Sequence, residues 1–181
     1  MSAKDWIDAG LRALAREGVD AVRVERLATR LAVTKGGFYW HFRDRPALLA
    51  AMLEAWKARA TAGVIEAVET GGGDARDRLR RLFSIILRAD GRLERAVRDW
   101  AGRDRAAFRA QSEIDRARVD YVAALLRQIG LGDAQSSFRA LFAYQALIGR
   151  YAMAGPGKPE ATRSEEHTSE LQSRGLISYA V

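Results

Sequence analysis

Residues 24–42 read VERLATRLAVTKGGFYWHF, and this stretch decides how the rest of the chain is interpreted. Its first part carries apolar residues at the i, i+3, i+4 and i+7 positions of one helix face: Val24, Leu27, Ala28 and Leu31. The next two residues, Ala32 and Val33, turn the chain, and the Thr34 hydroxyl is placed to cap a second helix over residues 35–41. The spacing therefore predicts two short helices joined by a tight turn.

The second of these helices is unlike a helix of a hydrophobic core. It begins with Lys35 and two glycines. Each glycine costs about 1 kcal/mol of helix stability relative to alanine. Only Phe38 and Phe42 are clearly directed to the core. Small residues let the start of the helix approach another surface closely, and its free N–H groups and dipole favour a polyanion. The pattern favours a helix-turn-helix that binds DNA, and a packed aromatic corner is the alternative.

Residues 27–53, LATRLAVTKGGFYWHFRDRPALLAAML, extend this pattern, and the chain over about residues 5–55 resembles the N-terminal DNA-binding domain of the TetR (tetracycline-repressor-like, TetR/AcrR) transcriptional regulators. The matching elements are Leu27-Ala28, Leu31, Val33-Thr34-Lys35-Gly36, Phe38-Tyr39-Trp40-His41-Phe42, Arg45 and Ala47-Leu48-Leu49. The resemblance implies that some of these residues face bases: Lys35, Gly36 and Gly37. It implies that others hold phosphates: Thr34, Tyr39, His41 and Arg45. Trp40 completes the expected set of DNA-binding residues.

Two residues depart from the family pattern. Arg23 stands where the family usually has a Ser or Thr cap, so the first helix of the pair is expected to start less firmly. Glu25 falls at a position that touches a base in some members. A carboxylate at that position could only accept a hydrogen bond from cytosine or stay out of the groove.

Composition narrows the function further. The chain has 181 residues, 30 Lys and Arg against 23 Asp and Glu, a net charge of +7, and no cysteine. No apolar run approaches the roughly 20 residues that span a bilayer, and no signal peptide is visible, so we expect a cytoplasmic protein. The residues offer no cysteine or histidine zinc site, no nucleophile motif and no phosphate loop. We therefore expect no enzyme activity, no catalytic residue, no metal and no cofactor.

The remaining chain predicts an all-α protein. Helical periodicity is expected over residues 4–17, in one long helix from about 46 to 69, and over 75–89, 93–102, 104–129 and 133–152. Gly71 to Gly73 form the expected hinge. The predicted division is a helix-turn-helix DNA-binding domain at 1–45, a helical ligand-binding and dimerisation domain at 46–155, incomplete in this chain, and a disordered tail at 156–181.

Aromatic residues of the second half could line a pocket for an unknown small-molecule effector: Phe83, Trp100, Phe108, Tyr121 and Tyr144. Each taken singly fits a core residue as well. By resemblance, the expected function is a ligand-responsive regulator, a repressor that binds a palindromic operator in double-stranded DNA as a homodimer and is released by its effector. The alternative is a helical module that binds a protein partner and never contacts DNA.

The end of the chain has an unusual pattern. Residues 163–181, RSEEHTSELQSRGLISYAV, resemble the translation of a common sequencing adapter around a short variable index, which predicts that the natural residues end near Thr162. Family members typically dimerise through their last two long helices. Here only residues 133–152 would remain, with Phe138, Phe142 and Tyr151 toward the partner, so we expect a weakened dimer.

Overall fold

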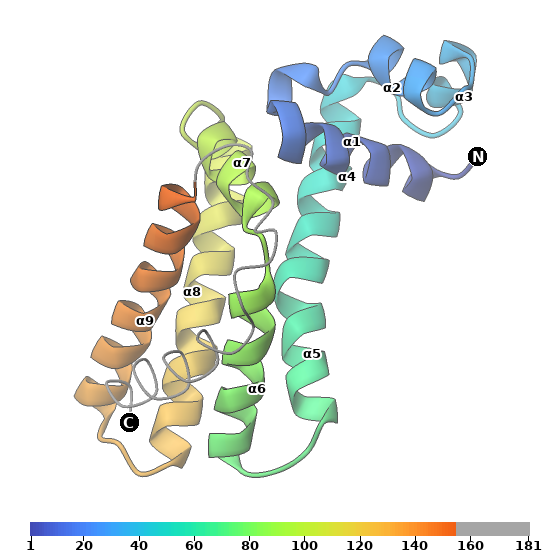
Figure 1. The fold of residues 1–181 in the computed structure, drawn as a ribbon. Helices are drawn as coiled ribbons and strands as arrows, with labels where there is room; N and C mark the ends of the chain where they lie inside the picture. Colours follow the sequence, from blue (N-terminus) through green and yellow to red (C-terminus); the bar gives the residue numbers. More distant parts are fainter. Residues whose placement is uncertain (155–181) are drawn as a thin grey trace. The chain divides into compact units, whose positions relative to one another are not determined.

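The computed structural model describes residues 1–154, and within them the regular structure is helical, with no strand. The elements in chain order are α1 (Ala3–Glu17), the 3-10 turn η1 (Val19–Ala21), α2 (Val24–Arg30), α3 (Lys35–Tyr39), α4 (Arg45–Lys57), the π turn η2 (Ala58–Ala62), α5 (Gly63–Thr70), α6 (Ala75–Arg88), α7 (Arg92–Ala101), α8 (Arg105–Gln128) and α9 (Asp133–Met153) (Figure 1). This confirms the all-α class. The interpretation of residues 156–181 lies outside the described residues.

Local sequence signals account for the helix ends. Gly18 follows α1 at a φ of 82°, and its N–H donates to the Leu14 carbonyl at 2.9 Å, so a glycine ends the helix that was expected over residues 4–17. Asp44 precedes α4 and accepts from the Ala47 N–H at 2.8 Å, with Pro46 in the first turn, where a missing N–H does no harm. This backbone hydrogen bond lowers the pKa of the Asp44 carboxyl below its ordinary value.

The long helix expected from residue 46 to 69 is interrupted. α4 ends at Lys57, the chain makes the π turn of η2, and α5 begins at Gly63. A π turn inserts one residue more per turn than an α-helix, so the faces of α4 and α5 are offset from one another. The apolar periodicity of the sequence does not indicate this offset. Thr61, which lies within the turn, is buried although it is polar, so the buried face does not follow the apolar pattern there.

The described chain forms two compact units that interleave along the sequence. The first comprises residues 1–70 with 89–116, and the second comprises residues 71–88 with those from 117 onward. α8 contributes to both. This grouping by contacts differs from the functional division at residue 45 that the sequence predicts. The functional boundaries stay predictions.

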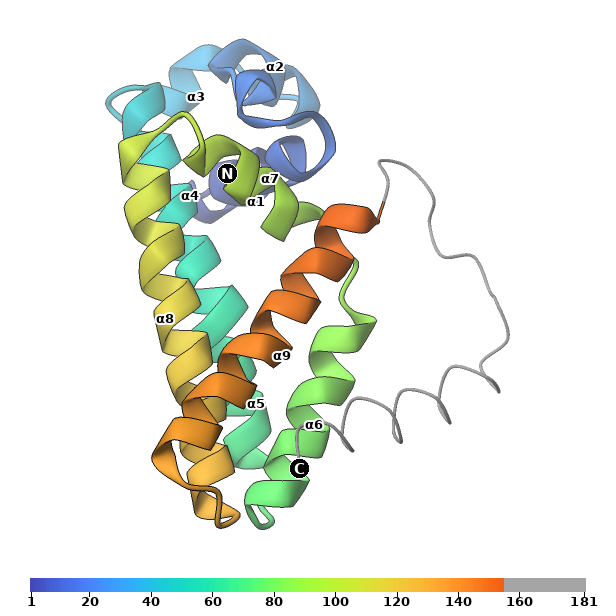
Figure 2. The same ribbon diagram turned by 90° about the vertical axis from the view of Figure 1, so that its left-hand side faces the viewer.

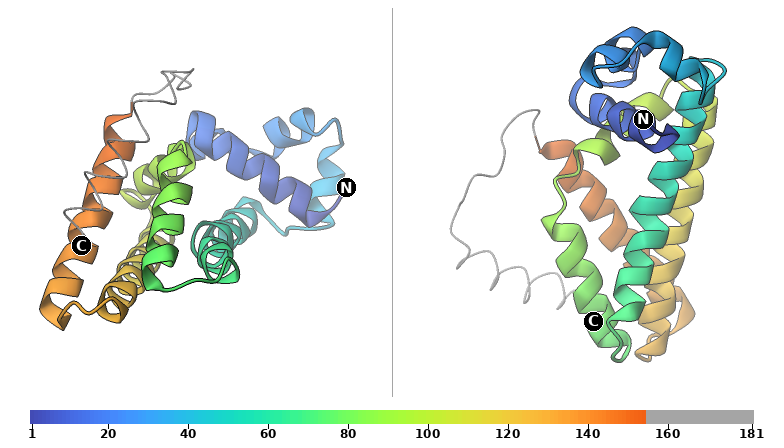
Figure 3. Two further views of the ribbon diagram at one scale, coloured as in Figure 1. Left: turned by 60° about the horizontal axis from the view of Figure 1, so that its bottom comes forward. Right: turned by 90° about the vertical axis from the view of Figure 1, so that its right-hand side faces the viewer.

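The first unit has one continuous core. Phe38 of α3 is fully buried and meets the Trp6 ring edge-on, with the ring centroids 5.3 Å apart. α1 packs on α4, where Met52 is fully buried (Figure 3). α7 packs against α1 as well and adds Val97 and Trp100 to the same core. The helix-turn-helix domain predicted at residues 1–45 is therefore stabilised by a helix that lies some 50 residues further along the chain.

The second unit joins α6, the end of α8 and α9 (Figure 2). Its core is smaller and consists of Ala75, Leu79, Ala123, Leu125, Leu126 and Ala140. At the end of α9, the Arg150 guanidinium donates to the Leu87 carbonyl at 2.8 Å and the Tyr151 hydroxyl donates to the Ile86 carbonyl at 3.1 Å. The expectation that Tyr151 faces a partner subunit is wrong, because its side chain is buried against α6.

The glycine turn between α5 and α6 is more constrained than a free hinge. Gly72 and Gly73 have φ values of 63° and 86°, a region that side chains with a Cβ avoid. The Arg81 guanidinium donates to the Gly71 carbonyl at 2.9 Å and to the Gly72 carbonyl at 3.0 Å. Replacing these glycines by alanine would strain the turn as well as stiffen it.

Candidate nucleic-acid interface

The turn between α2 and α3 is held by backbone hydrogen bonds. The Val33 N–H donates to the Ala28 carbonyl at 3.0 Å, and the Ala32 N–H donates to the Thr29 carbonyl at 3.2 Å. Ala32 has a φ of 55°, in the left-handed region, and is the one non-glycine residue with positive φ in the described chain. The tight turn expected at Ala32 and Val33 is therefore confirmed, with backbone strain at its centre.

Two phenylalanines anchor α3 to the core, and the rest of the helix faces outward. Phe38 is fully buried and Phe42 is 8% exposed, as predicted. In contrast, the Trp40 side chain is 88% exposed and Tyr39 is 62% exposed. Large aromatic side chains without a core to fill are unusual on a protein surface, and they mark a surface that meets a partner.

The exposed face of α3 brings together most of the DNA-binding residues expected from the sequence: Thr34, Lys35, Gly36, Tyr39, Trp40 and His41. Gly37 is half-buried. Thr34 stands at the N-cap position, but its hydroxyl accepts no capping hydrogen bond. The expected hydroxyl cap is therefore wrong. Arg23 before α2 likewise supplies no side-chain cap, as the departure from the family pattern indicated.

Lys35 forms an ion pair across the turn that the sequence did not predict. Its ammonium lies 2.9 Å from Glu25 Oε1, and both side chains remain more than half exposed. The hydrogen bond from Lys35 lowers the pKa of the Glu25 carboxyl below its ordinary value, so the carboxyl is ionised at neutral pH. The pair places one acceptor and one donor side by side where α2 and α3 meet.

Arg45 is used by the fold. Its guanidinium donates to the Val22 carbonyl at 2.6 Å and to the Val19 carbonyl at 2.8 Å. These bonds tie the first turn of α4 to the segment that leads into α2. In the described chain Arg45 therefore holds the segment before α2 to α4, and the phosphate contact that the resemblance implies for it stays a prediction.

The glycines of α3 have no structural cause within the described chain. A Cβ added at Gly37 would meet nothing within 4 Å, and one added at Gly36 would lie 3.7 Å from the Thr34 hydroxyl, an ordinary contact. Neither residue has a positive φ. Alanine at either position would favour the helix.

Sequence reasoning missed one exposed cation beside this surface. The Arg43 side chain is 86% exposed and lies 2.9 Å from Asp44 Oδ2, directly after Phe42. The sequence feature that could have identified Arg43 is its position between two predicted helices. His41, by contrast, was expected at the surface, and its Nε2 lies 3.1 Å from the Met1 carbonyl.

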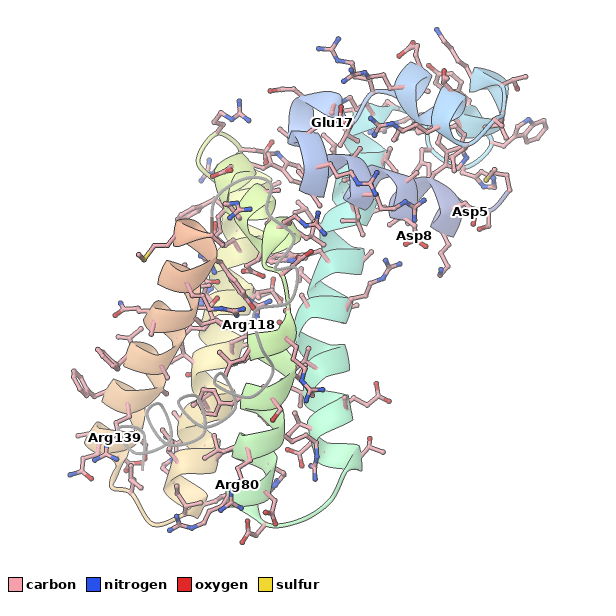
Figure 4. The ribbon with its side chains drawn as sticks, in the orientation of Figure 1. Asp5, Asp8, Glu17, Arg80, Arg118 and Arg139 are labelled. Atoms are coloured by element: carbon pink, nitrogen blue, oxygen red, sulfur yellow. The ribbon has the colours of Figure 1, made fainter. Side chains whose placement is uncertain are left out.

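The residues expected to line an effector pocket fall in both compact units. Trp100 is 4% exposed and belongs to the core of the first unit, whereas Phe108 in the same unit is 57% exposed. Phe83 and Tyr121 pack against the core of the second unit. There the Tyr144 hydroxyl accepts from Arg118, which projects from α8 (Figure 4), at 3.3 Å.

Two other kinds of feature are a metal site and a membrane-spanning helix. Among residues 1–154 there is no group of three or more His, Asp or Glu residues arranged as a metal site. No helix in that range is both long enough and apolar enough to cross a membrane.

The segment that carries this surface is similar to known proteins. The family described as bacterial regulatory proteins, tetR family, matches residues 7–52. Over 52 residues the chain is 46% identical to the tetracycline repressor protein class A from transposon 1721 of Escherichia coli, a match that covers 29% of this chain and 24% of that protein. The match thus spans about a quarter of the length of that curated relative.

Solved structures extend the similarity to the fold of both units. A transcriptional regulator from Rhodococcus sp. Rha1 has a TM-score of 0.75 at 22% identity, with 98% of this chain and 97% of that chain covered. A TetR-family transcriptional regulator from Streptomyces coelicolor has a TM-score of 0.71 at 22% identity, with 98% and 87% covered. At these identities the likeness concerns the fold.

Proposed function

We propose that the chain is a regulator of the TetR family, whose model matches its helix-turn-helix domain, and that it is a transcriptional repressor that binds a palindromic operator as a homodimer and is released by a small-molecule effector. The family is one of DNA-binding regulators rather than enzymes. The repressor role is supported by the curated relative, which is itself a repressor.

The observation that carries the DNA-binding proposal is the outward face of α3. Lys35 and His41 supply hydrogen-bond donors, and Tyr39 supplies a hydroxyl beside an exposed aromatic surface. The glycines at the start of α3 leave its backbone open to close approach. In a helix-turn-helix the N-terminal residues of the second helix contact base edges in the major groove. The Lys35 ammonium is then within reach of a guanine edge.

The homodimer proposal rests on the exposed apolar face of α9. Phe138 is 70% exposed and Phe142 is 59% exposed, and their rings stack with centroids 6.4 Å apart. Leu141 beside them is 45% exposed. A contiguous apolar patch of this kind is typical of a subunit interface. Two copies related by a two-fold axis would read the two halves of a palindrome.

The effector proposal concerns the helices outside the helix-turn-helix. Phe83 and Tyr121 supply apolar surface, and the Arg118–Tyr144 pair supplies polar groups. An apolar wall with few polar groups is the usual composition of a small-molecule site. The identity of the effector is left to a ligand screen against the complex with DNA.

A titration at several salt concentrations tests the DNA-binding proposal. Binding sites are first selected from a random double-stranded library, and the dissociation constant of the selected site is then measured by fluorescence anisotropy from low to moderate salt. We expect log K to fall linearly with log salt concentration, because phosphate contacts release counterions. A selection that enriches no sequence, together with binding that is insensitive to salt, would support the protein-interaction module instead.

A further inference from the structure

An open groove of about 620 Å³ lies within the first compact unit, away from the residues of α2 and α3. It is bordered by α1, by the junction of α4 and η2, and by residues 90–93 at the start of α7. Its apolar lining consists of the partly exposed Ala15, Ala60 and Leu93 and the buried Leu11 and Trp56. The groove therefore joins three segments that are distant in sequence, and it is separate from the surface assigned to DNA.

The polar lining of the groove is predominantly positive: Arg12, Arg16, Arg59 and Arg92 against Asp8 and Asp90. Both aspartates are already paired. Asp8, which projects from α1 (Figure 4), is 2.6 Å from Arg59 and 2.9 Å from Lys4. Asp90 is 2.6 Å from Arg92.

Two arginines of the groove have no such partner. Within residues 1–154, neither Arg12 nor Arg16 makes a hydrogen bond or an ion pair, and both are exposed. They lie four residues apart on α1, so their guanidinium groups occupy the same face one turn apart. Like charges at this spacing destabilise a helix by a few tenths of a kcal/mol. An anion held between them would remove that repulsion.

The π turn supplies an independent observation at the same place. η2 contributes Arg59 and Ala60 to the groove, directly after Trp56. Single π turns inside α-helices occur frequently at functional sites, because they reorient side chains that a regular helix would direct elsewhere. Here Arg59 of the turn pairs with Asp8 of α1, and the buried Trp56 lies directly before the turn in α4.

We propose that this groove binds a small organic anion. Arg12 and Arg16 bind its acidic group, a carboxylate, sulfonate or phosphate, and the partly exposed Ala15, Ala60 and Leu93 contact its apolar body. Guanidinium groups suit this role because their N–H donors match the oxygens of such groups in pairs. The inference does not depend on DNA binding, and it concerns a site other than the aromatic residues considered for the effector.

Two probes of nearly equal shape test the proposal on the full chain. The anionic probe is 8-anilinonaphthalene-1-sulfonate, and the neutral probe is N-phenyl-1-naphthylamine, which lacks the sulfonate. Affinity is measured by isothermal titration calorimetry, and the site is identified from the indole N–H resonances of the ¹⁵N-labelled protein. The Trp56 resonance is assigned with Trp56→Phe. We expect the anionic probe to shift Trp56 and to leave the exposed Trp40 unchanged.

Charge variants separate this site from non-specific binding. Arg12→Gln/Arg16→Gln should weaken the anionic probe about tenfold, as the loss of two charge-assisted contacts implies. The matched control is Arg76→Gln/Arg80→Gln, two exposed arginines at the same spacing on α6. It should bind as the parent does. Circular dichroism verifies that each variant is folded. An unmoved Trp56 resonance, equal affinity for the two probes, or unchanged binding by the Arg12 and Arg16 variant would each overturn the proposal.

Discussion

Glu25 and Lys35 form an ion pair across the two helices of the proposed DNA-reading surface, with 2.9 Å between Nζ and Oε1. Lys35 would read guanine, whereas a carboxylate repels phosphates and accepts from the cytosine amino group. A single G·C pair presents both partners. The pair also holds Lys35 in one place before DNA arrives, which reduces the ordering cost of binding.

A comparison of Lys35→Ala with Tyr39→Phe and His41→Ala tests this assignment. Lys35→Ala should relax the preference at one position of each half-site and cost about 1–3 kcal/mol at the preferred sequence. Tyr39→Phe and His41→Ala should weaken binding to all sequences alike, because both residues are proposed to contact phosphate. Binding-site selection followed by titration distinguishes the two patterns. An unchanged preference in Lys35→Ala would remove its role in reading a base.

Ala32 offers a second prediction at this scale. Its φ of 55° costs an L-residue with a Cβ about 1–2 kcal/mol relative to the right-handed region, and glycine avoids most of that cost. We expect Ala32→Gly to raise the free energy of unfolding by about 1 kcal/mol, once the entropy of glycine in the unfolded chain is included. Urea denaturation measures the change. Ala28→Gly, within helix α2, is the control and should lower it.

At the scale of single elements, α3 is a helix whose sequence gives it low intrinsic stability. It spans Lys35–Tyr39, lacks a side-chain cap, and begins with two glycines that neither sterics nor backbone angles require. The helix is held in place by Phe38 in the core. A weak helix with a strong anchor fits an element that gives up intrinsic stability for close contact with a partner.

Gly37→Ala tests that trade between stability and contact. We expect it to raise the free energy of unfolding by up to about 1 kcal/mol, because alanine favours a helix over glycine. It should also weaken operator binding by about tenfold or more, since a methyl group separates the backbone from the bases. Thermal unfolding and anisotropy titration provide the two measurements.

The control for this variant is Gly63→Ala, at the exposed start of α5, where an added Cβ lies 3.6 Å from the Ala58 carbonyl. It should leave operator binding unchanged. If Gly37→Ala bound the operator as tightly as the parent, the glycine would have no role in close approach.

At the scale of the whole molecule, the described chain forms two compact units with different features. The first binds α7 and the start of α8 into the same core as the helix-turn-helix. The second carries the exposed aromatic face of α9. We propose DNA binding for the first unit and association of two copies for the second, so we expect that each function can be impaired separately.

Phe138→Arg/Phe142→Arg should convert a dimer into a monomer and leave the fold of the first unit intact. Opposing charges of the same sign on a two-fold interface repel, and the stacked apolar surface is lost. Sedimentation equilibrium measures the mass, and anisotropy with full and half operators measures the lost cooperation between half-sites. Phe108→Arg, an exposed aromatic of the first unit, is the control. The same mass in parent and variant would place the interface elsewhere.

Several structural features of this protein could be predicted from its sequence because they depend on local interactions. Helix periodicity, the tight turn at Ala32 and Val33 and the outward face of α3 depend on neighbours within one or two turns, so residues 24–42 were sufficient to predict a helix-turn-helix. The match to the family model, at residues 7–52, includes this stretch.

Other features depend on residues that the chain brings together from far apart. Arg45 bonds to the carbonyls of Val19 and Val22, Tyr151 turns toward α6, and α7 joins the core beneath α1. The ion pair of Glu25 with Lys35 joins two helices whose approach is set by the turn between them. Such contacts are selected by packing and charge in three dimensions, because a side chain binds whichever group the folded backbone places within reach.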